Sequence, residues 1–320
     1  MLVAWIVVAV AAVFAVSAVA TIFLGRAVEA ASPPAGRFVE IGGRRIHLVD
    51  RRAAGRPDGP VIVVLHGAVS SLLDPLAALD GRLDAIGRVV FVDRPGHGYS
   101  DRLGKADATL VAQANVVAGV LDALAVDRAV IVGHSFGGAV AATFALRHPE
   151  RTAGLVLIGA PTHPWPGGIA FAYRLVAAAV VGPFVAATVA TPIGLVLLSG
   201  GVRAVFEPEP LPKDFSPRAG YPLSVRAGAF RATGEDVVAL FDGVAAQVAD
   251  YPAIRAPTAI IAGDRDGIVS STLHARAMAA AVPGARLTIL PGAGHMVHAT
   301  RPEAVVAAVQ DVVARAEAVH

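Results

Sequence analysis

Short runs of Val, Ile and Leu recur along the chain, and stretches with helical spacing of apolar residues separate them. Six such runs occupy residues 61–66, 88–93, 129–134, 154–160, 258–264 and 286–292. Helical patterns fill residues 110–125, 137–147, 272–281 and 303–316. Near-continuous apolar runs joined by helices are typical of a parallel sheet with helices on both faces. The pattern therefore predicts an α/β fold.

A hairpin is expected ahead of these runs. The segment FVEIGGRRIHLVD, residues 38–50, contains two strand-like runs separated by Gly42 and Gly43. A Gly-Gly pair between two such runs indicates a tight antiparallel turn. With this hairpin the predicted sheet has eight strands and is mostly parallel. Ligands of such sheets bind beyond the carboxyl ends of the strands, so polar residues that follow each run are candidates for chemistry.

The regular spacing fails once, between the fourth and fifth of the six runs. The interval is too long for a simple crossover, and we expect it to form a helical lid, residues 162–256, inserted after the sixth strand. Residues 175–201 carry no charge, which fits either internal packing or a surface that faces lipid or an acyl substrate. A second transmembrane helix is disfavoured, because Pro183 and Pro192 divide this stretch into pieces too short to span a bilayer.

Residues 2–24 form the other long apolar stretch and contain no charge. A helix of this length reaches roughly 34 Å at ~1.5 Å per residue, enough to cross the ~30 Å hydrocarbon core of a bilayer. We interpret it as a membrane anchor; the alternative is a signal peptide cleaved near residues 27–32, which would release a secreted protein. The anchor is favoured because no Lys or Arg precedes the stretch, which is longer than a usual signal. The arginines that follow, beginning with Arg26, favour a cytoplasmic catalytic body.

These patterns divide the chain into an N-terminal anchor, a linker, a core in two parts and a lid. The expected boundaries are 1–25 for the anchor, 26–36 for the linker, 37–161 for the first part of the core, 162–256 for the lid and 257–320 for the second part of the core. Pro33 and Pro34 mark the linker.

Composition excludes several classes of protein. Of the 320 residues, 55% are apolar and 16% are charged, so the chain can bury a large core and is not a disordered protein. The net charge is +2 and the arginines are scattered, which gives no basic surface for nucleic acid. The absence of cysteine excludes disulfides, thiolate metal sites and a cysteine nucleophile. The ten histidines show no spacing typical of metal ligands, and neither a metal nor another cofactor is expected.

One segment combines a strand end, a serine and a helix start. In GHSFG, Ser135 lies between Gly133 and Gly137 and directly follows a buried run. A turn this short forces an unusual backbone conformation at its apex and favours glycine where the two elements approach closely. This is the setting of the G-x-S-x-G nucleophile elbow. Ser135 is therefore the candidate nucleophile.

A serine nucleophile needs a base, and the base needs an acid that orients it. His295 follows the last apolar run in a glycine-rich segment, and Asp264 and Asp266 follow the run before it. The order serine, acid, histidine is the one found in α/β-hydrolases. On these segments, and over roughly residues 37–316, the chain resembles the lid-bearing branch of the α/β-hydrolase family, which includes esterases and lipases.

The resemblance implies a role for particular residues. The family pattern G-x-x-D-x-x-V selects Asp266 over Asp264 as the acid of the triad. The family pattern G-x-G-H selects His295 over His298, which is expected at a helix start or on the surface. Asp264 is expected to cap amides of a turn.

By the same resemblance, the backbone N–H groups of Ala68 and Phe136 form an oxyanion hole, which stabilises the charge that develops on a substrate oxygen. Further residues are expected to order the loops of the site without taking part in the chemistry. These are His66, Gly67, Gly133, Gly137 and Asp93.

The resemblance also bears on the reaction. Epoxide hydrolases and haloalkane dehalogenases of the family carry aspartate at the elbow, so Ser135 disfavours both activities. We expect hydrolysis of small carboxylic esters, and the apolar lid and membrane contact through residues 2–24 favour lipophilic ones. A carbon–carbon bond hydrolase, in which Ser70 or Ser71 would supply polar groups, and a cofactor-free perhydrolase are alternatives. A non-catalytic binding protein with this fold would be expected to lack a member of the triad.

Overall fold

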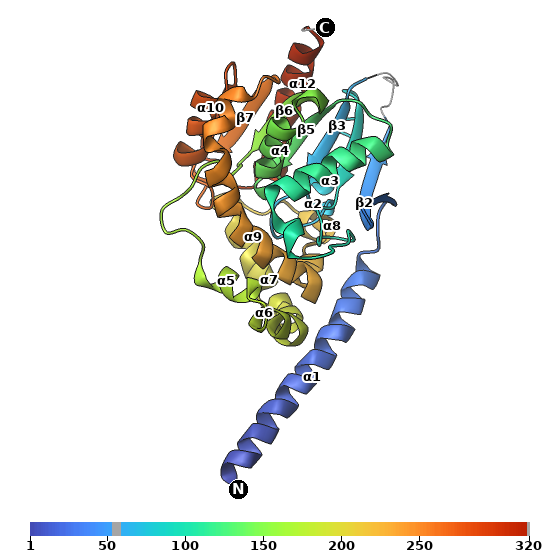
Figure 1. The fold of residues 1–320 in the computed structure, drawn as a ribbon, viewed down its shortest axis with the longest axis vertical. Coiled ribbons are helices and arrows are strands. Elements are labelled where there is room, and N and C mark those ends of the chain that lie inside the picture. The colour runs from blue at the N-terminus through green and yellow to red at the C-terminus, as the bar shows by residue number, and fades with distance from the viewer. Residues whose placement is uncertain (53–58, 319–320) are drawn as a thin grey trace.

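The computed structural model describes residues 1–52 and 59–318. Its centre is an eight-stranded sheet in the order β1-β2-β4-β3-β5-β6-β7-β8 (Figure 1). The strands are β1 Arg37–Ile41, β2 Arg44–Arg51, β3 Val61–Leu65, β4 Arg88–Val92, β5 Ala129–His134, β6 Thr152–Ile158, β7 Thr258–Gly263 and β8 Arg286–Leu290. Strands β3 to β8 are parallel, whereas β2 pairs antiparallel with both β1 and β4. The prediction of eight mostly parallel strands is confirmed.

The hairpin lies where the glycine pair predicts it. Gly42 and Gly43 connect β1 to β2 with φ angles of +55° and +78°. Two successive residues with positive φ match the twist of a two-residue hairpin turn, and glycine adopts them without a Cβ clash.

Helices cover both faces of the sheet. The core helices are α2 Leu73–Leu79, α3 Leu110–Ala123, α4 Phe136–Arg147, α10 Ala277–Ala281, α11 Val297–Thr300 and α12 Pro302–Glu317. Short helical turns η1 Lys105–Ala108, η2 Pro149–Arg151 and η6 Thr272–Arg276 accompany them. Side chains alternate along the central strands, so that Ile131 faces α3 and α4 whereas Val130 and Val132 face α12.

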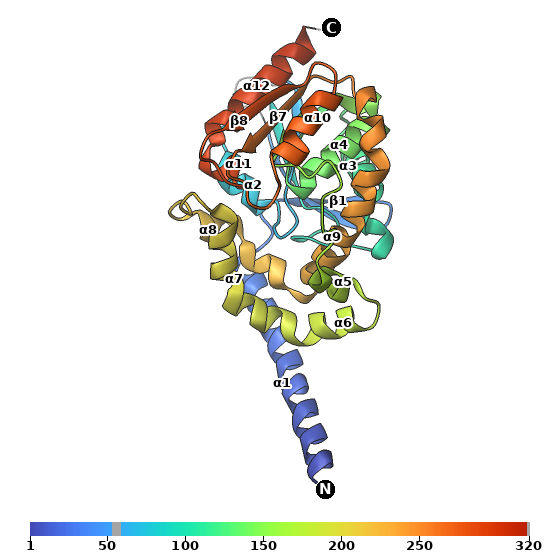
Figure 2. The same cartoon turned by 90° about the vertical axis from the view of Figure 1, so that its left-hand side faces the viewer.

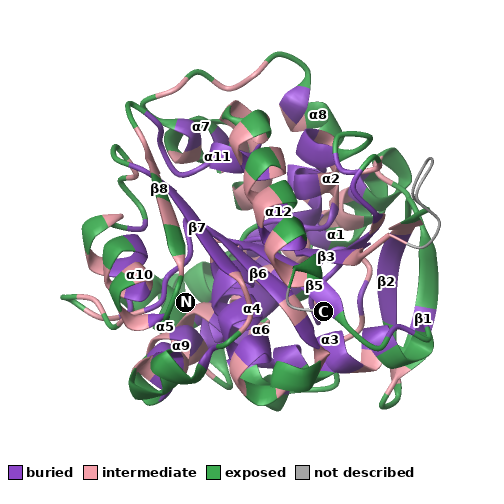
Figure 3. Ribbon diagram, turned by 90° about the horizontal axis from the view of Figure 1, so that it is seen from above, coloured by how far each residue is buried: buried purple, intermediate pink, exposed green. Residues whose placement is uncertain are grey.

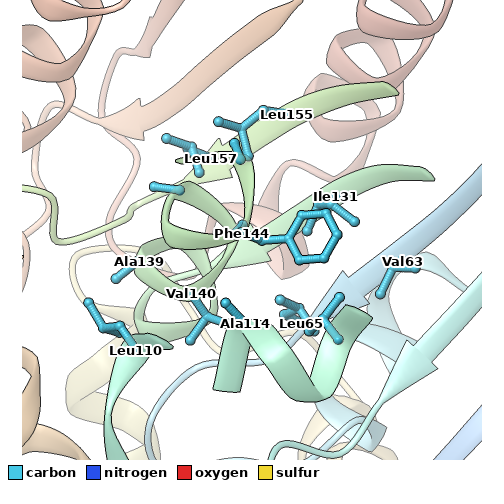
Figure 4. Close-up of a cluster of buried hydrophobic side chains, with 14 of the residues drawn as sticks. Val63, Leu65, Leu110, Ala114, Ile131, Ala139, Val140, Phe144, Leu155 and Leu157 are labelled. Atoms are coloured by element: carbon cyan, nitrogen blue, oxygen red, sulfur yellow. The ribbon is translucent and has the colours of Figure 1, made fainter. Parts of the chain in front are cut away.

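Two apolar cores result, one on each face. Figure 4 shows the first, where strand side chains meet α3 and α4. Its labelled residues are Val63, Leu65, Leu110, Ala114, Ile131, Ala139, Val140, Phe144, Leu155 and Leu157. The central strands are almost entirely buried, as Figure 3 shows in purple. The sheet is therefore a rigid base from which the loops at its carboxyl edge project.

A long helical segment, residues 159–257, connects β6 to β7; we call it the inserted segment. It contains α5 Phe171–Ala177, α6 Val181–Val185, η3 Ala186–Ala190, α7 Thr191–Phe206, α8 Phe215–Ala219, η4 Tyr221–Val225, α9 Ala227–Gln247 and η5 Val248–Ala253. Figures 1 and 2 place α5, α6 and α7 between the core and the outer part of the N-terminal helix. Helices thus follow the sixth strand, as the sequence predicts.

One expectation about this segment is wrong. The sequence predicts that Pro183 and Pro192 break its apolar stretch into short helices, whereas Val181–Phe206 is one helical run of 26 residues. Pro183 lies in the first turn of α6, where the missing N–H has no intrahelical partner to lose. Pro192 lies in the first turn of α7, directly after the wide π-helical turn η3. Among the described residues, this run and the N-terminal helix are the two helices long and apolar enough to cross a membrane.

The N-terminal helix α1 extends over Leu2–Ala31 and projects away from the core (Figure 1). The predicted linker at 26–36 is therefore helical as far as Ala31. Residues 26–31 include good helix formers such as Ala and Glu, and the helix stops just before Pro33, because a residue that precedes proline is disfavoured in the α conformation.

Candidate active site

Ser135 occupies the tight turn between β5 and α4. Its φ and ψ angles are +52° and −122°, a region that residues with a side chain rarely adopt. A Cβ atom added to Gly133 would lie 2.3 Å from the carbonyl oxygen of Gly137, and one added to Gly137 would lie 2.5 Å from that of Leu65. Both positions therefore require glycine, and the strained turn presents the Ser135 side chain to the cavity described below.

Asp266 and His295 meet at the ends of β7 and β8. Asp266 Oδ2 lies 2.8 Å from His295 Nδ1, and both side chains are buried. The other oxygen of Asp266 accepts hydrogen bonds from the backbone N–H groups of Ile268 and Val269, each at 2.8 Å. These bonds fix the carboxylate, which in turn orients the imidazole. His295 and Ser135 line the same cavity.

The two alternative residues lie apart from this pair. Asp264 is exposed, and its carboxylate accepts a hydrogen bond from the N–H of Gly292 at 2.7 Å. His298 lies in the short helix α11, as one expectation had it, but it is fully buried rather than on the surface. It is buried because its ring packs against His134, with ring centroids 4.1 Å apart, and bonds Asp74 at 3.2 Å.

The backbone groups expected to form an oxyanion hole come from two elements. Phe136 is the first residue of α4, so its N–H has no intrahelical partner. Ala68 follows Gly67, whose carbonyl oxygen accepts hydrogen bonds from Arg94 Nη2 at 2.8 Å and Ser70 Oγ at 3.3 Å. Because that carbonyl and the N–H of Ala68 belong to one planar peptide unit, holding the oxygen sets the direction of the N–H. Arg94 also stacks over the ring of Phe136 at 4.3 Å.

Arg94 is 2% exposed, and its charge is balanced within the protein. Its Nη1 lies 2.6 Å from Asp236 Oδ2 on α9 of the inserted segment, and Arg102 and His97 bond the same carboxylate. Burial would raise the pKa of Asp236, but Arg94, His97 and Arg102 together hold it well below its usual range. Burial and the guanidinium of Arg94 lower the pKa of His97 to about 4, so its ring is neutral at pH 7. Arg94 therefore connects the inserted segment to the loop that contains Gly67 and Ala68, which we call the oxyanion loop.

Two of the residues expected to order the loops, His66 and Asp93, are buried and hydrogen-bonded. His66 is fully buried, and its Nε2 accepts a hydrogen bond from the N–H of Arg94 at 3.0 Å. Burial and the nearby Arg94 lower the pKa of His66 well below its usual value. Asp93 accepts hydrogen bonds from the N–H groups of Leu72 and Tyr99 and lies 2.7 Å from His47 Nδ1.

A second buried polar cluster lies next to Ser135, and its Asp74, His134 and Tyr221 line the cavity described below. Asp74 Oδ1 accepts a hydrogen bond from the hydroxyl of Tyr221 at 2.9 Å, and its Oδ2 lies 3.2 Å from His298 Nε2. Burial, His298 and His295 lower the pKa of His134 well below its usual value. Asp74, His134 and His298 place one potential metal-ligand atom each within 4.8 Å of one another. A cation there would have to replace the bonds that Asp74 already makes, so these residues fit a polar packing cluster better than a metal site.

The cavity that contains Ser135 and His295 has a volume of about 580 Å³, in the range of small-molecule sites. Core loops and the inserted segment both line it. The apolar lining includes Val69, Phe136, Trp165, Ile169, Val205, Val237, Leu240 and Leu273. Among the described residues that line it, none is Lys or Arg. The cavity therefore suits an uncharged ligand with substantial apolar surface.

Sequence reasoning missed several residues that support the site. Arg94 lies in the loop directly after β4, but its contact with Gly67 depends on how that loop folds. Asp236 lies within a helical pattern with nothing in its neighbours to mark it, and Asp74 and Tyr221 meet over a separation of 147 residues. No local pattern carries these pairings.

The fold and the matched sequence together define the class. The chain belongs to the alpha/beta hydrolase family, whose model matches residues 62–308. It is 28% identical over 302 residues to a 2-hydroxymuconate semialdehyde hydrolase from Pseudomonas putida, covering 90% of this chain and 98% of the relative. It is 30% identical over 283 residues to the Mycobacterium tuberculosis protein Rv2715, covering 84% of this chain and 78% of that protein.

Solved structures share the fold. An esterase from Thermogutta terrifontis superposes with a TM-score of 0.69 at 23% identity, covering 88% of this chain and 99% of the esterase. A membrane phospholipase A superposes with a TM-score of 0.68 at 23% identity, covering 99% of this chain and 97% of the phospholipase. At these identities the similarity establishes the fold, and the reaction has to be argued from the site.

Proposed function

We propose that this protein is a serine hydrolase of carboxylic esters. Ser135 acts as the nucleophile, His295 as the general base and acid, and Asp266 as the group that orients His295. The observation that carries the proposal is the 2.8 Å pair between Asp266 and His295 at the cavity that Ser135 also lines. A strained serine, an oriented imidazole and two backbone donors, expected from Ala68 and Phe136, are the parts that acyl transfer requires.

The proposed reaction has two halves. Ser135 Oγ attacks the ester carbonyl carbon while His295 accepts the hydroxyl proton, and the N–H groups of Ala68 and Phe136 stabilise the oxyanion. His295 then returns the proton to the leaving alcohol as the carbon–oxygen bond breaks. In the second half, water attacks the acyl carbon while His295 accepts a proton from it. His295 then gives this proton to Ser135 Oγ as the acyl–serine bond breaks, and the acid product leaves. Loss of one oxyanion donor, a side-chain amide, costs about 3–4 kcal/mol of barrier in a serine protease.

The proposed substrate is an uncharged, lipophilic ester. The cavity lining supports this, because most of its residues are apolar and no Lys or Arg among the described lining residues can balance a carboxylate on the substrate. We further propose that residues 162–256 act as a lid over core parts 37–161 and 257–320, and that residues 2–24 anchor the protein in a membrane. The N-terminal helix is uncharged over residues 2–24 and has no buried side chain over its most apolar window, which supports the anchor.

A carbon–carbon bond hydrolase is the second candidate. It is favoured by the Pseudomonas putida relative, which matches this chain over nearly its whole length and is named for 2-hydroxymuconate semialdehyde. Ser70, buried beside the oxyanion loop, could contribute a polar group to such a site. A muconate-type substrate carries a carboxylate, however, for which the described cavity lining offers no cationic side chain. The ester reading therefore fits the site better.

Labelling with a fluorophosphonate probe tests the nucleophile. We expect the wild-type protein and Ser270→Ala, which alters another serine of the same cavity, to be labelled, and Ser135→Ala to remain unlabelled. An unlabelled wild-type protein would instead support a non-catalytic binding protein.

Turnover assays separate the two reactions. A series of nitrophenyl esters with short to long acyl chains, in detergent, should show hydrolysis with a preference for chains beyond about eight carbons, because apolar burial adds ≈ 0.8 kcal/mol per CH₂. Cleavage of a 2-hydroxymuconate semialdehyde at a higher kcat/KM than any ester would favour the second candidate.

A further inference from the structure

The inserted segment carries an exposed apolar surface next to α1. Nine of its large apolar side chains are exposed, and the seven that concern us are Phe171, Val180, Val181, Phe184, Ile193, Val196 and Leu197. The exposed fractions of Val196 and Leu197 on α7 are 78% and 64%. We call these seven residues the apolar face. Six of the seven lie within residues 175–202, which contain no charged residue. Exposed apolar side chains gathered on neighbouring helices are typical of an interaction site.

The apolar face is fixed to α1 by specific contacts. The hydroxyls of Ser17 and Thr21 both donate to the carbonyl oxygen of Thr188, each at 2.7 Å. The rings of Phe14 and Phe184 lie 4.9 Å apart. Thr188 is in η3, between α6 and α7, so the helices that carry the apolar face cross α1 at the level of residues 14–21. Figure 2 shows α6 and α7 lying across α1 at this level.

The length of α1 then sets the depth of the apolar face. Helix α1 begins at Leu2, and at ~1.5 Å per residue a hydrocarbon core of ~30 Å takes up about 20 residues. If residues 2–24 span the bilayer, Ser17 lies several ångströms inside the hydrocarbon boundary and Thr21 lies close to it. Residues packed against them cannot lie wholly in water.

The charges near the apolar face support the same placement. Arg174 and Arg203 flank its uncharged run, and Arg26 is the first charged residue of α1. At the next turn of α1, Glu29 pairs with Arg226 of the inserted segment at 2.6 Å. Arginines at the border of an apolar surface suit the headgroup region of a membrane with anionic lipids.

We propose that the apolar face docks into the acyl region of the same membrane that α1 spans. The inference rests on the proposed anchor and adds to it that the inserted segment is itself partly immersed. Tyr173 on α5 and Val205 on α7 line the active-site cavity, so the helices that enter the membrane also form a wall of the cavity. A lipophilic ester would then reach Ser135 from the bilayer.

The absence of cysteine allows a direct test on the full-length protein. Single variants Val196→Cys and Leu197→Cys carry an NBD fluorophore in the apolar face, and Val10→Cys carries it in α1. Ala314→Cys on the exposed side of α12, at the opposite end of the molecule, is the matched control. The labelled proteins are reconstituted into phosphatidylcholine and phosphatidylglycerol vesicles, with and without doxyl-labelled lipid.

We expect blue-shifted emission that the doxyl lipid quenches at positions 10, 196 and 197, and neither effect at 314. Quenching at 10 with water-like emission at 196 and 197 would overturn the docking and leave the anchor intact. Water-like emission at all four positions would overturn the anchor and the docking together. A blue shift at 196 and 197 that persists in detergent and is insensitive to doxyl lipid would identify a second copy as the occupant and overturn the proposal.

The same samples keep this inference separate from the reaction. Fluorophosphonate labelling of Ser135 in the vesicles reports on the proposed hydrolase activity, whereas the fluorescence reports only on position. Docking without labelling would leave the membrane inference standing and contradict the proposed function.

Discussion

Arg94 Nη1 lies 2.6 Å from Asp236 Oδ2, which joins the loop after β4 to helix α9 of the inserted segment. The same guanidinium bonds the Gly67 carbonyl, whose peptide unit carries the N–H of Ala68. The inserted segment thus reaches the oxyanion loop through two side chains. Movement of α9 would be transmitted to the donor that the proposed reaction needs.

Arg94→Lys should lower kcat with little change in KM. Lysine keeps the charge but cannot bond Gly67 and Asp236 with the geometry of a guanidinium fork, so the Ala68 N–H loses its fixed direction. We expect kcat to fall by at least about tenfold, since direct loss of an oxyanion donor costs about 10²–10³. Steady-state kinetics on a soluble nitrophenyl ester measure both constants.

Arg44→Lys is the matched control, because Arg44 pairs with Asp107 away from the cavity. It should leave kcat unchanged. If Arg94→Lys instead raises KM and leaves kcat unchanged, Arg94 shapes substrate binding and does not position the oxyanion donor.

Ser135→Gly should produce an inactive protein that is more stable than Ser135→Ala. Both variants lose the hydroxyl, but only glycine relieves the positive φ angle at the turn. Strain of this kind costs about 1–3 kcal/mol, partly offset by ~0.5–1 kcal/mol of extra chain entropy for glycine, so we expect a net gain of about 1 kcal/mol. Urea unfolding of the two variants side by side measures it; equal midpoints would mean that the strain relieved is no larger than the entropy cost of glycine.

Stability should fall as the pH is lowered from about 6.5 towards 4. Burial is the main cause that lowers the pKa of His97 and of His274 to about 4, whereas an unfolded histidine titrates near 6.5. Between these values the unfolded state binds more protons, so stability rises with pH in this window, by at most about 1.4 kcal/mol per pH unit for each histidine. Chemical unfolding at pH 4.5, 5.5, 6.5 and 7.5 tests the trend.

His274→Gln separates the contribution of one of these groups. The Nδ1 of His274 accepts a hydrogen bond from the N–H of Thr162 at 3.2 Å, which requires the neutral ring. The variant should show a shallower loss of stability between pH 6.5 and 4 than the wild type. An identical slope would assign the acid sensitivity to other groups.

Chelation should leave the protein unchanged. Both oxygens of Asp74 are engaged, by Tyr221 and by His298, so a cation would have to displace bonds that this carboxylate already makes. We expect EDTA to alter neither the melting temperature nor the activity. Tyr221→Phe should lower the free energy of unfolding by about 1–2 kcal/mol, because this substitution removes the buried hydrogen bond to Asp74. A drop in melting temperature on chelation, reversed by Zn²⁺, would show that Asp74, His134 and His298 hold a metal.

Much of the fold follows from local pattern. The periodicity of apolar residues predicts the eight strands and the core helices α3, α4, α10 and α12, but not the short α2 and α11, since each longer element buries a face whose spacing is set by its own geometry. The elbow at Ser135 and the hairpin at Gly42 and Gly43 are equally local, because only certain residues fit those backbone conformations. The predicted interruption of the apolar run at Pro183 and Pro192 is wrong. Both prolines lie in the first turn of a helix, where proline is tolerated, and a π-helical turn precedes Pro192.

What the sequence alone determined is therefore the order of strands and helices along the chain, the nucleophile elbow and the candidate acid and base at the strand ends. Tertiary structure decided which distant groups meet: Arg94 with Asp236, Asp74 with Tyr221, and Thr188 with α1. The physical reason is that backbone periodicity and turn chemistry act over a few residues and leave a mark in the sequence. Pairing between buried polar groups depends on how whole elements pack, and neither partner carries a local signal of the other.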